Sequence, residues 1–432
     1  MEYGIIFAEI MRHSDYRARY IDEIVDLYLS TFGAVCIEGP KWCGKTWTSQ
    51  AHAKSAYLVG DPADNFANRE LARLDVSQTL KGEAPHLIDE WQEVPAIWDA
   101  VRHAVDQAGE PGRYVLTGSS TPQNKGVLHS GTGRIALLPM HPMCLAESGD
   151  SDGLVSMADV CAGNPIGIQA GRSPTVEELI GLIIRGGWPG SIGKSSRQAA
   201  LIPRQYVENV VKIDVNKVDG IERDAVKIRK CLRSLARNES TTAATATIRD
   251  DIAETDDTSL SINTVTDYLS VFKRMFLTND IGPFSTFLRS PIRIKQSVKR
   301  HFCDPSIAAA LLGASEAMLL RDAKTRGCLF ESMALRDLQI YAEALGGTLY
   351  HYQDYDNDEI DAVIQLEDDE WCAFEIKMNP QDVDEAAAGL IEISKKFVRK
   401  PPRALAVVVG KSGIARRRDD GVYVLPLTML RK

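Results

Sequence analysis

The feature that most constrains the fold is a short loop, Gly39 to Thr46, with the sequence GPKWCGKT. It has the phosphate-loop spacing G-x-x-x-x-G-K-T. Gly39 and Gly44 allow the backbone to curl, so that successive amide N–H groups point into one concavity that accepts phosphate oxygens. Such a loop needs a strand before it and a helix after it. The apolar run 34–37 and the stretch 46–54, which lacks Gly and Pro, meet both conditions.

The loop therefore predicts a site for a nucleoside triphosphate, with ATP and Mg²⁺ as cofactors. Lys45 is expected to reach the β- and γ-phosphates, and the Thr46 hydroxyl is expected to ligate Mg²⁺. The helix that begins there adds partial positive charge at its N-terminus. The residues expected to contact the nucleotide are Gly39, Pro40, Lys41, Trp42, Cys43, Gly44, Lys45, Thr46, Trp47 and Ser119.

Strands and helices alternate around this loop. A helical pattern over 15–31 precedes it, apolar strand-like runs follow at 57–59, 86–90 and 114–120, and a helical pattern covers 95–107. Alternation of this kind predicts an α/β fold with a parallel, doubly wound sheet and ligands at the carboxyl ends of its strands.

An acid pair ends the second of these later runs. Asp89 is expected to hold Mg²⁺ or its water shell, and Glu90 to orient or deprotonate the attacking water, which would make it catalytic together with Lys45. Ser119 stands where a hydroxyl at a strand end could sense the γ-phosphate. Arg134 could neutralise charge in the transition state. A simple surface position is the alternative for both Ser119 and Arg134.

With these residues, the chain resembles the prokaryotic AAA-type ATPases in which a P-loop domain precedes a C-terminal nuclease-like domain. The matching blocks are IEGPK at 37–41, GKT at 44–46, IDE at 88–90 with Gln92, LTGSS at 116–120, GR at 133–134 and RGGWP at 185–189. The chain departs at Trp91, where the family more often has a smaller aliphatic residue. It also departs over 148–174, a polar segment typical of an insertion or loose loop. Sites of this type are often completed by a neighbouring subunit, which implies a homo-oligomer with Arg134 acting in trans.

Residues 225–300 suggest a winged helix-turn-helix. Helices are expected over 226–236, 248–254 and 261–274, with Ser261 as the N-cap of the last. The exposed groups of that helix would be Asn263, Thr264, Thr266, Lys273 and Arg274. The stretch 281–303 lacks acidic residues and would form a basic wing with Arg289, Arg293, Lys295, Lys299 and Arg300. DNA is the expected partner of the 261–300 segment. Packing between protein domains is the alternative.

A second constellation lies near the C-terminus. Asp361 and Glu375 lie fourteen residues apart (375 − 361 = 14), a strand–turn–strand distance, and Lys377 shares a strand face with Glu375. Asp361 and Glu375 would hold Mg²⁺, and Lys377 would position or deprotonate water for phosphodiester cleavage. The pattern resembles the restriction-endonuclease-like PD-(D/E)-x-K fold, which implies a further metal-binding acid at Glu331. Folds of this type are also retained for binding alone.

Composition limits the classes of protein to which the chain can belong. The formal net charge of −9 argues against a protein that coats nucleic acid uniformly. Eight cysteines form no C-x-x-C pair, which favours a reducing cytoplasm over a zinc ribbon or a disulfide framework. No apolar run approaches the length that spans a bilayer, so no membrane partner is expected. The start has no signal-peptide pattern, and Met11 is an alternative to Met1 as first residue.

At 432 residues the chain is expected to hold several domains. We expect an AAA-like P-loop ATPase domain with a lid over 15–195, a winged-helix-like domain over 200–305 and a nuclease-like α/β domain over 320–432. The first hypothesis is Mg²⁺-dependent ATP binding and hydrolysis, coupled to a C-terminal part that engages or cleaves DNA. The second is a nucleotide-dependent switch or adaptor that binds a protein partner and whose nuclease fold is inactive.

Overall fold

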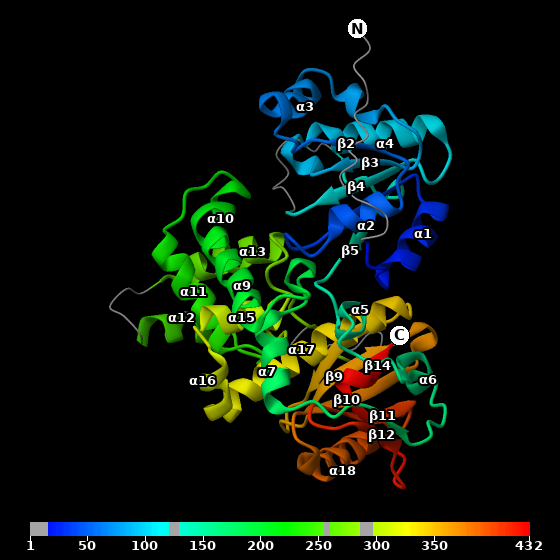
Figure 1. Cartoon of the computed structure of the whole chain (residues 1–432), viewed down its shortest axis with the longest axis vertical. Helices are drawn as coiled ribbons and strands as arrows, with labels where there is room; N and C mark the ends of the chain where they lie inside the picture. The colour runs from blue at the N-terminus through cyan, green and yellow to red at the C-terminus, as the bar shows by residue number, and fades with distance from the viewer. Residues whose placement is uncertain (1–15, 121–128, 255–259, 286–296) are drawn as a thin grey trace. The chain divides into compact units, whose positions relative to one another are not determined.

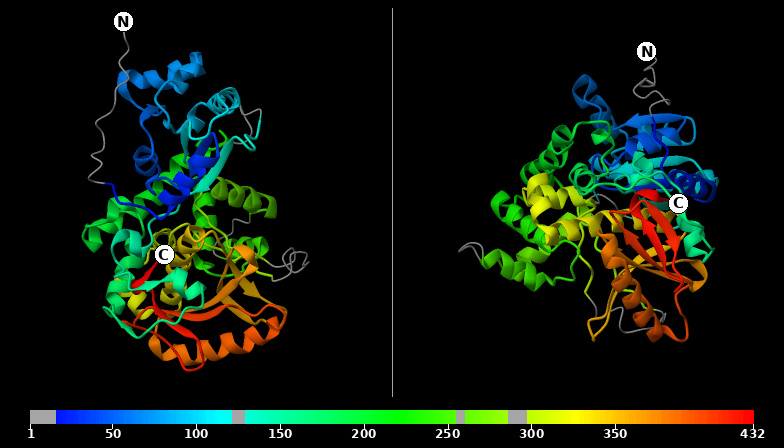
Figure 2. Two further views of the ribbon diagram at one scale, coloured as in Figure 1. Left: turned by 90° about the vertical axis from the view of Figure 1, so that its right-hand side faces the viewer. Right: turned by 60° about the horizontal axis from the view of Figure 1, so that its bottom comes forward.

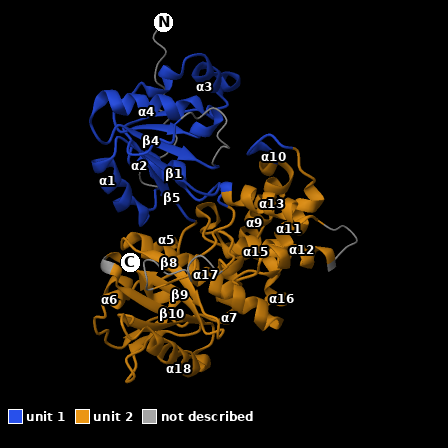
Figure 3. Ribbon diagram, turned by 180° about the vertical axis from the view of Figure 1, so that it is seen from behind, with its two compact units in different colours: residues 1–141, 216–221, 274–276 blue, residues 142–215, 222–273, 277–432 orange. Residues whose placement is uncertain are grey.

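The computed structural model describes residues 16–120, 129–254, 260–285 and 297–432. The chain divides into two compact units, shown in separate colours in Figure 3. The first contains the residues up to His141 together with 216–221 and 274–276, and the second contains 142–215, 222–273 and 277–432. Each unit has its own large sheet.

The sheet of the first unit is parallel throughout, as the alternation of strands and helices predicts. Its strands lie in the order β2-β3-β4-β1-β5. Figure 1 labels these strands except β1. Their bounds are β1 Ala34–Glu38, β2 Ser55–Leu58, β3 His86–Asp89, β4 Tyr114–Gly118 and β5 Ile135–Pro139. Because all five run in one direction, the residues that follow β1, β3 and β4 gather at the same edge of the sheet.

Helices cover both faces of this sheet. Their bounds are α1 Ile21–Thr31, α2 Lys45–Ala51, α3 Ala63–Leu74 and α4 Ala96–Ala108. Alternate residues of β1 point to opposite faces: Ala34 and Cys36 join the core that contains α4, whereas Val35 and Ile37 join the core that contains α1. Burial on both faces explains why these strands read as continuous apolar runs rather than as alternating ones.

The sheet of the second unit has seven strands in the order β7-β12-β13-β11-β10-β9-β8. Strands β10, β11 and β13 are parallel, and the other pairs are antiparallel. The bounds are β7 Gln169–Ala170, β8 Thr348–Gln353, β9 Glu359–Gln365, β10 Trp371–Lys377, β11 Ala404–Val409, β12 Ile414–Arg417 and β13 Tyr423–Pro426. Helix α18, Val383–Ser394, packs on one side of this sheet and α17, Ala323–Ala344, on the other (Figure 2).

Further helices complete the second unit. They are α5 Leu145–Ser148, α6 Met157–Cys161, α7 Val176–Arg185, α8 Ser196–Ala199, α9 Leu201–Asn209, α10 Val215–Lys217, α11 Ala225–Arg237, α12 Thr245–Glu254, α13 Ile262–Arg274, α15 Pro305–Leu311 and α16 Glu316–Arg321. The last residues of α10 and α13 are assigned to the first unit. Helices α11, α12 and α13 lie where three helices were expected, and the Ser261 hydroxyl accepts the Thr264 amide hydrogen as an N-cap. Among the described residues, no helix is both long enough and apolar enough to cross a membrane.

The segment 142–195 differs from expectation, because it groups with the C-terminal sheet rather than with the ATPase core. Strand β7 pairs with β12, and β6, Val155–Ser156, pairs with β14, Leu430–Arg431. The polar stretch 148–174 is therefore tied to the second unit by two strand pairings instead of forming a loose loop. The division into three domains stays a prediction.

The RGGWP block at 185–189 has a structural explanation. A Cβ atom on Gly186 would lie 2.3 Å from a carboxylate oxygen of Asp304, and one on Gly187 would lie 2.1 Å from the carbonyl oxygen of Met143. The Trp188 indole donates to the Ser306 hydroxyl at 2.9 Å. The block is a tightly packed turn, and its glycines are required by this close approach of backbones.

Candidate functional site

The phosphate loop connects β1 to α2 and is shaped by its two glycines. Gly44 has a φ of 110°, a conformation that side chains other than glycine rarely adopt. A Cβ atom on Gly39 would lie 2.2 Å from the carbonyl oxygen of Met140. The Gly39 amide donates to the carbonyl oxygen of Gly118 at 3.3 Å, which joins the loop to the end of β4. The expected strand–loop–helix context is present.

Lys45 begins α2 and is buried within the loop. Its ammonium donates to the carbonyl oxygens of Gly39 and Pro40, at 3.0 and 2.9 Å. Burial raises the pKa of the carboxyl of Glu38, at the end of β1, to about 7. The nearby charge of Lys45 opposes that shift. The lysine is thus placed at the concave side of the loop, where a phosphate would be bound.

The acid at the end of β3 meets the loop directly. Oδ1 of Asp89 accepts hydrogen bonds from the hydroxyls of Thr46, at 3.0 Å, and Thr117, at 2.6 Å. Burial raises the pKa of Asp89, and the two hydroxyls oppose this effect. Sequence reasoning assigned no role to Thr117. The position of Thr117 could have indicated a role, because it is a hydroxyl residue near the end of β4, the strand next to β3 in the sheet.

Glu90 is held by residues that follow β4. Its backbone has a φ of 58°, and its amide donates to the Thr117 hydroxyl at 2.9 Å. Its carboxylate accepts from the Ser119 hydroxyl at 3.0 Å and from the side-chain amide of Gln92. Gln92 also donates to Ser119 at 3.2 Å. Ser119 therefore contacts the expected catalytic acid, and Gln92 is a site residue that sequence reasoning did not assign.

Arg19 is a second residue that sequence reasoning missed. It lies just before α1 and is buried, and its guanidinium donates to the carbonyl oxygens of Cys43, at 3.0 Å, and His141, at 2.8 Å. It therefore fixes the middle of the phosphate loop. Of the aromatic loop residues, Trp42 is 68% exposed and Trp47 37% exposed, so both indoles face solvent in part.

Arg134 is not brought to the loop within this chain. It precedes β5, and its carbonyl oxygen accepts from the amide of Ala34 at the start of β1, whereas the loop follows the end of β1. Its guanidinium bonds to Asp106 at 2.7 Å, and its side chain is 47% exposed. Arg134 therefore lies at the opposite edge of the sheet from the phosphate loop of its own chain. Action on a neighbouring subunit stays a prediction.

The second expected constellation is also assembled. Asp361 lies on β9, Glu375 and Lys377 lie on β10, and Glu331 lies on α17. Asp361 accepts the Ile376 amide hydrogen at 2.8 Å, and Lys377 pairs with Glu375 at 2.7 Å. Burial raises the pKa of the Glu375 carboxyl to about 7 and, with Asp361 nearby, that of Glu331 to about 8.

A lysine that sequence reasoning placed in a solvent-exposed wing enters this cluster. The ammonium of Lys299 lies 2.6 Å from Glu331, 3.0 Å from Glu359 and 3.4 Å from Asp361. These three carboxylates surround the Lys299 ammonium. Across the described ranges, no group of three or more Asp, Glu, His or Cys side chains is arranged to hold a metal ion.

The expected DNA-binding face is present only in part. Asn263, Thr266 and Lys273 are exposed on α13, whereas Arg274 pairs with Asp219 at 2.8 Å. In the basic stretch, Arg289, Arg293 and Lys295 lie outside the described residues. Lys299 is buried in the carboxylate cluster and Arg300 pairs with Asp280 at 2.6 Å, so the expectation that these two form an exposed wing is wrong.

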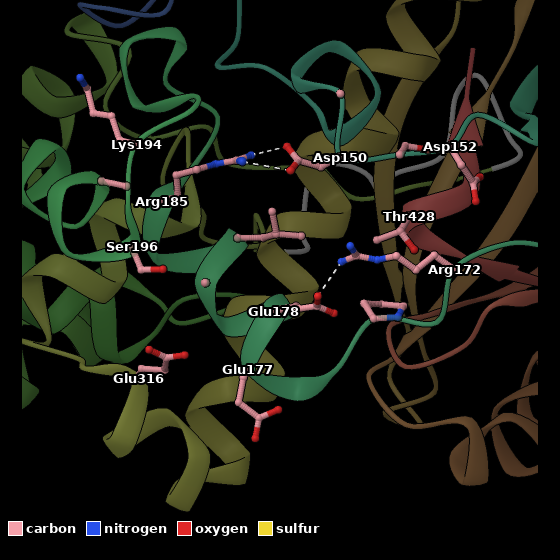
Figure 4. Close-up of a pocket in the computed structure, with 16 residues that line it drawn as sticks. Asp150, Asp152, Arg172, Glu177, Glu178, Arg185, Lys194, Ser196, Glu316 and Thr428 are labelled. Atoms are coloured by element: carbon pink, nitrogen blue, oxygen red, sulfur yellow. Dashed lines mark hydrogen bonds and ion pairs between the residues drawn. The ribbon is translucent and has the colours of Figure 1, made fainter.

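A cavity of about 580 Å³ in the second unit shares no residue with either constellation (Figure 4). Among its lining residues, Arg185 pairs with Asp150 at 2.5 Å, and Arg172 pairs with Glu178 at 2.9 Å. Both guanidinium groups are thus neutralised by carboxylates of the same wall. We assign no activity to this cavity.

Comparison with known families places three matches along the chain. An AAA domain model matches residues 31–148, which contain the phosphate loop, Asp89 and Glu90. Two models described as "Domain of unknown function", DUF8612 and DUF4143, match residues 176–317 and 326–430. The first unit thus has the fold and the phosphate loop of a P-loop domain, and its similarity to AAA domains supports nucleotide binding. The winged-helix and nuclease-like interpretations are not confirmed by the other two matches.

Among individual proteins, the chain is similar to uncharacterized proteins of Mycobacterium bovis and Mycobacterium tuberculosis. Each is 24% identical over 349 residues, which cover 79% of this chain and 70% of the relative. Two solved structures also match at 14% identity. The Walker-type ATPase of Pyrococcus abyssi has a TM-score of 0.43, with coverage of 69% of this chain and 97% of that one. The Aeropyrum pernix ORC1 protein in complex with DNA has a TM-score of 0.27, with coverage of 72% and 94%. Structural similarity at this level carries no functional argument.

Proposed function

We propose that the first unit hydrolyses ATP with Mg²⁺. Lys45 binds the β- and γ-phosphates, Thr46 and Asp89 hold Mg²⁺, and Glu90 orients or deprotonates the attacking water. Bound Mg²⁺ supplies charge neutralisation for the phosphates. One observation carries this proposal: the hydrogen bond between the hydroxyl of Thr46 and the carboxylate of Asp89, 3.0 Å long. This contact supports the proposal, because it joins the phosphate loop to the first residue of the acid pair.

The remaining geometry of the loop supports the same proposal. Gly39 and Gly44 occupy positions where a Cβ atom would clash or strain the backbone. The Lys45 ammonium is oriented by two loop carbonyl oxygens and not by a carboxylate, so a phosphate can replace them without breaking an ion pair. Hydroxyl and carboxylate oxygens are the ligands that Mg²⁺ prefers.

The test is phosphate release from ATP in the presence of Mg²⁺. Lys45→Ala is expected to abolish hydrolysis. Lys54→Ala is the matched control, because Lys54 is exposed shortly after α2 and pairs with Glu83 on the surface; this variant should keep full activity. Hydrolysis that persists in Lys45→Ala would show that the assignment of the loop is wrong.

We further propose that the second unit engages DNA in a nucleotide-dependent way. The support is the polar exposed face of α13, which carries Asn263, Thr266 and Lys273. A lysine that contacts a phosphate contributes about one unit to the slope of log affinity against log salt. Lys273→Ala is therefore expected to weaken binding to duplexes of any sequence and to reduce that slope by about one.

The alternative is a nucleotide-dependent adaptor for a protein partner. The observation that favours it is the internal pairing of Lys299 and Arg300, which removes two cations from the expected DNA contact. The outcome that supports the adaptor is intact ATP hydrolysis with no salt-dependent DNA affinity across single- and double-stranded forms. Nucleotide-dependent DNA affinity that falls with salt supports the proposed DNA engagement by the second unit.

A further inference from the structure

The ammonium of Lys299 lies within the carboxylate cluster of the second unit. Its three partners are Glu331 on α17 and Glu359 and Asp361 on β9, at 2.6, 3.0 and 3.4 Å. Three carboxylate oxygens thus lie within 4 Å of this ammonium, and Asp361 accepts a hydrogen bond from it. Only 1% of the Lys299 side chain is exposed.

Backbone pairing holds Lys299 in this position. Its amide and carbonyl groups exchange two hydrogen bonds with Ile281, each 2.9 Å long. The next residue, Arg300, donates its amide hydrogen to Thr241 at 2.7 Å, and its guanidinium pairs with Asp280. The segment that contains Lys299 is thus held by backbone hydrogen bonds to Ile281 and to Thr241. Its burial does not depend on the side chain alone.

The ammonium and a divalent cation would compete for the same place. The ammonium lies 2.6 Å from Glu331 and 3.4 Å from Asp361, so it fills space between two carboxylates that a magnesium ion shared by them would need. The other carboxylate oxygen of Asp361 accepts the Ile376 amide hydrogen, and Glu375 pairs with Lys377. Each of these carboxylates already has a partner.

Charge balance keeps the lysine there. An unpaired ammonium at this depth would be strongly destabilising, and two or three unpaired carboxylates would be equally so. Removing the ammonium alone would leave the carboxylates buried without an opposite charge, and removing the carboxylates alone would leave the ammonium in the same state.

We propose that Lys299 is the resident cation of this cluster: its ammonium occupies the position in which a divalent metal would be held, and the cluster takes no metal while Lys299 is in place. In this arrangement the second unit does not cleave phosphodiester bonds through a metal bound at Asp361. The carboxylates instead anchor the segment that contains Lys299 to α17 and β9. This inference is independent of the proposed ATP hydrolysis.

The test counts Mn²⁺ bound to the nucleotide-free full-length chain, from the loss of the free-ion signal in electron paramagnetic resonance. Wild-type protein and Asp361→Asn are expected to bind the same amount, because the cluster contributes no site. Lys299→Ala is expected to gain a site, and the double variant Lys299→Ala with Asp361→Asn is expected to lose it again. The Asp361 dependence separates this site from weak binding at Thr46 and Asp89.

Thermal unfolding provides a second test of metal binding at the cluster. Mn²⁺ should raise the unfolding midpoint of Lys299→Ala by at least about 2 °C more than it raises the wild-type midpoint, and chelator should reverse the difference. Lys299→Gln serves the same purpose if Lys299→Ala does not fold. The proposal is overturned if wild-type protein binds Mn²⁺ or nicks plasmid in a way that Asp361→Asn abolishes. It is equally overturned if a folded Lys299 variant gains no site.

Discussion

The hydroxyl of Thr46 lies 3.0 Å from Oδ1 of Asp89, although the two residues are 43 positions apart in the chain. Thr46 is in the first turn of α2, and Asp89 ends β3. The contact brings a hydroxyl and a carboxylate, two oxygen ligands suited to Mg²⁺, to the edge of the sheet where the phosphate loop begins.

Thr46→Val should raise the Mg²⁺ concentration needed for half-maximal ATP hydrolysis by roughly tenfold or more, because it removes one ligand and one partner of Asp89. Thr46→Ser keeps the hydroxyl and should stay close to wild type. The measurement is a Mg²⁺ titration of phosphate release at fixed ATP. Equal requirements in the two variants would contradict a metal-binding role for Thr46.

Glu90→Gln should lower kcat by roughly 10²-fold or more and leave ATP binding intact, because the amide cannot accept a proton from water. Ser119→Ala should cause a smaller loss, since it removes one hydrogen bond that orients Glu90. Single-turnover hydrolysis, with ATP binding followed separately, distinguishes the two effects. Glu93→Gln is the matched control, because Glu93 is three residues away and its side chain is 47% exposed. A comparable loss in that variant would argue against a special role for Glu90.

Gly187→Ala should lower the free energy of unfolding by about 1–3 kcal/mol, because its Cβ atom would lie 2.1 Å from the carbonyl oxygen of Met143. Gly190→Ala is the control within the same turn. Nothing lies within 4 Å of a Cβ atom there, so the change should be close to neutral. Urea denaturation of both variants measures the difference. Similar stabilities would mean that the turn can shift to make room.

Glu239 should make stability depend on pH. It is fully buried, accepts hydrogen bonds from the Phe302 amide and the Ser332 hydroxyl, and burial raises its pKa from 4.5 to about 8. The folded state therefore binds this proton more tightly than the unfolded state. Its contribution to stability is full below pH 4.5 and is lost as the pH rises toward 8.

Glu239→Gln removes this dependence, so the stability of the variant relative to wild type should increase steadily between pH 5 and pH 8. Urea denaturation at several pH values within that window measures the difference. Glu370→Gln, at an exposed position, controls for the loss of a negative charge. A difference that does not change with pH would show that Glu239 titrates normally in the folded protein.

Local patterns in the sequence were sufficient for much of the first unit. The glycine spacing of 39–46, the apolar runs and the acid pair after β3 depend on neighbouring residues, so they predict the loop, the parallel sheet and the edge where the site lies. Local patterns also predict part of the C-terminal cluster of acids and lysines. A strand period of two puts Glu375 and Lys377 on one face, and a short connection puts Asp361 beside them.

Long-range contacts decided the rest. Arg134 follows a glycine turn that resembles its family block, yet the direction of β5 places it at the far edge of the sheet. Lys299 belongs to a run of basic residues, and isolated lysines are normally solvated. It is buried because Ile281 pairs with its backbone and because α17 and β9 supply three carboxylates from distant parts of the chain. The sequence by itself determined the nucleotide loop, whose chemistry is local. Only the tertiary structure decided which cation the C-terminal carboxylates hold, because that depends on how segments far apart in the chain pack together.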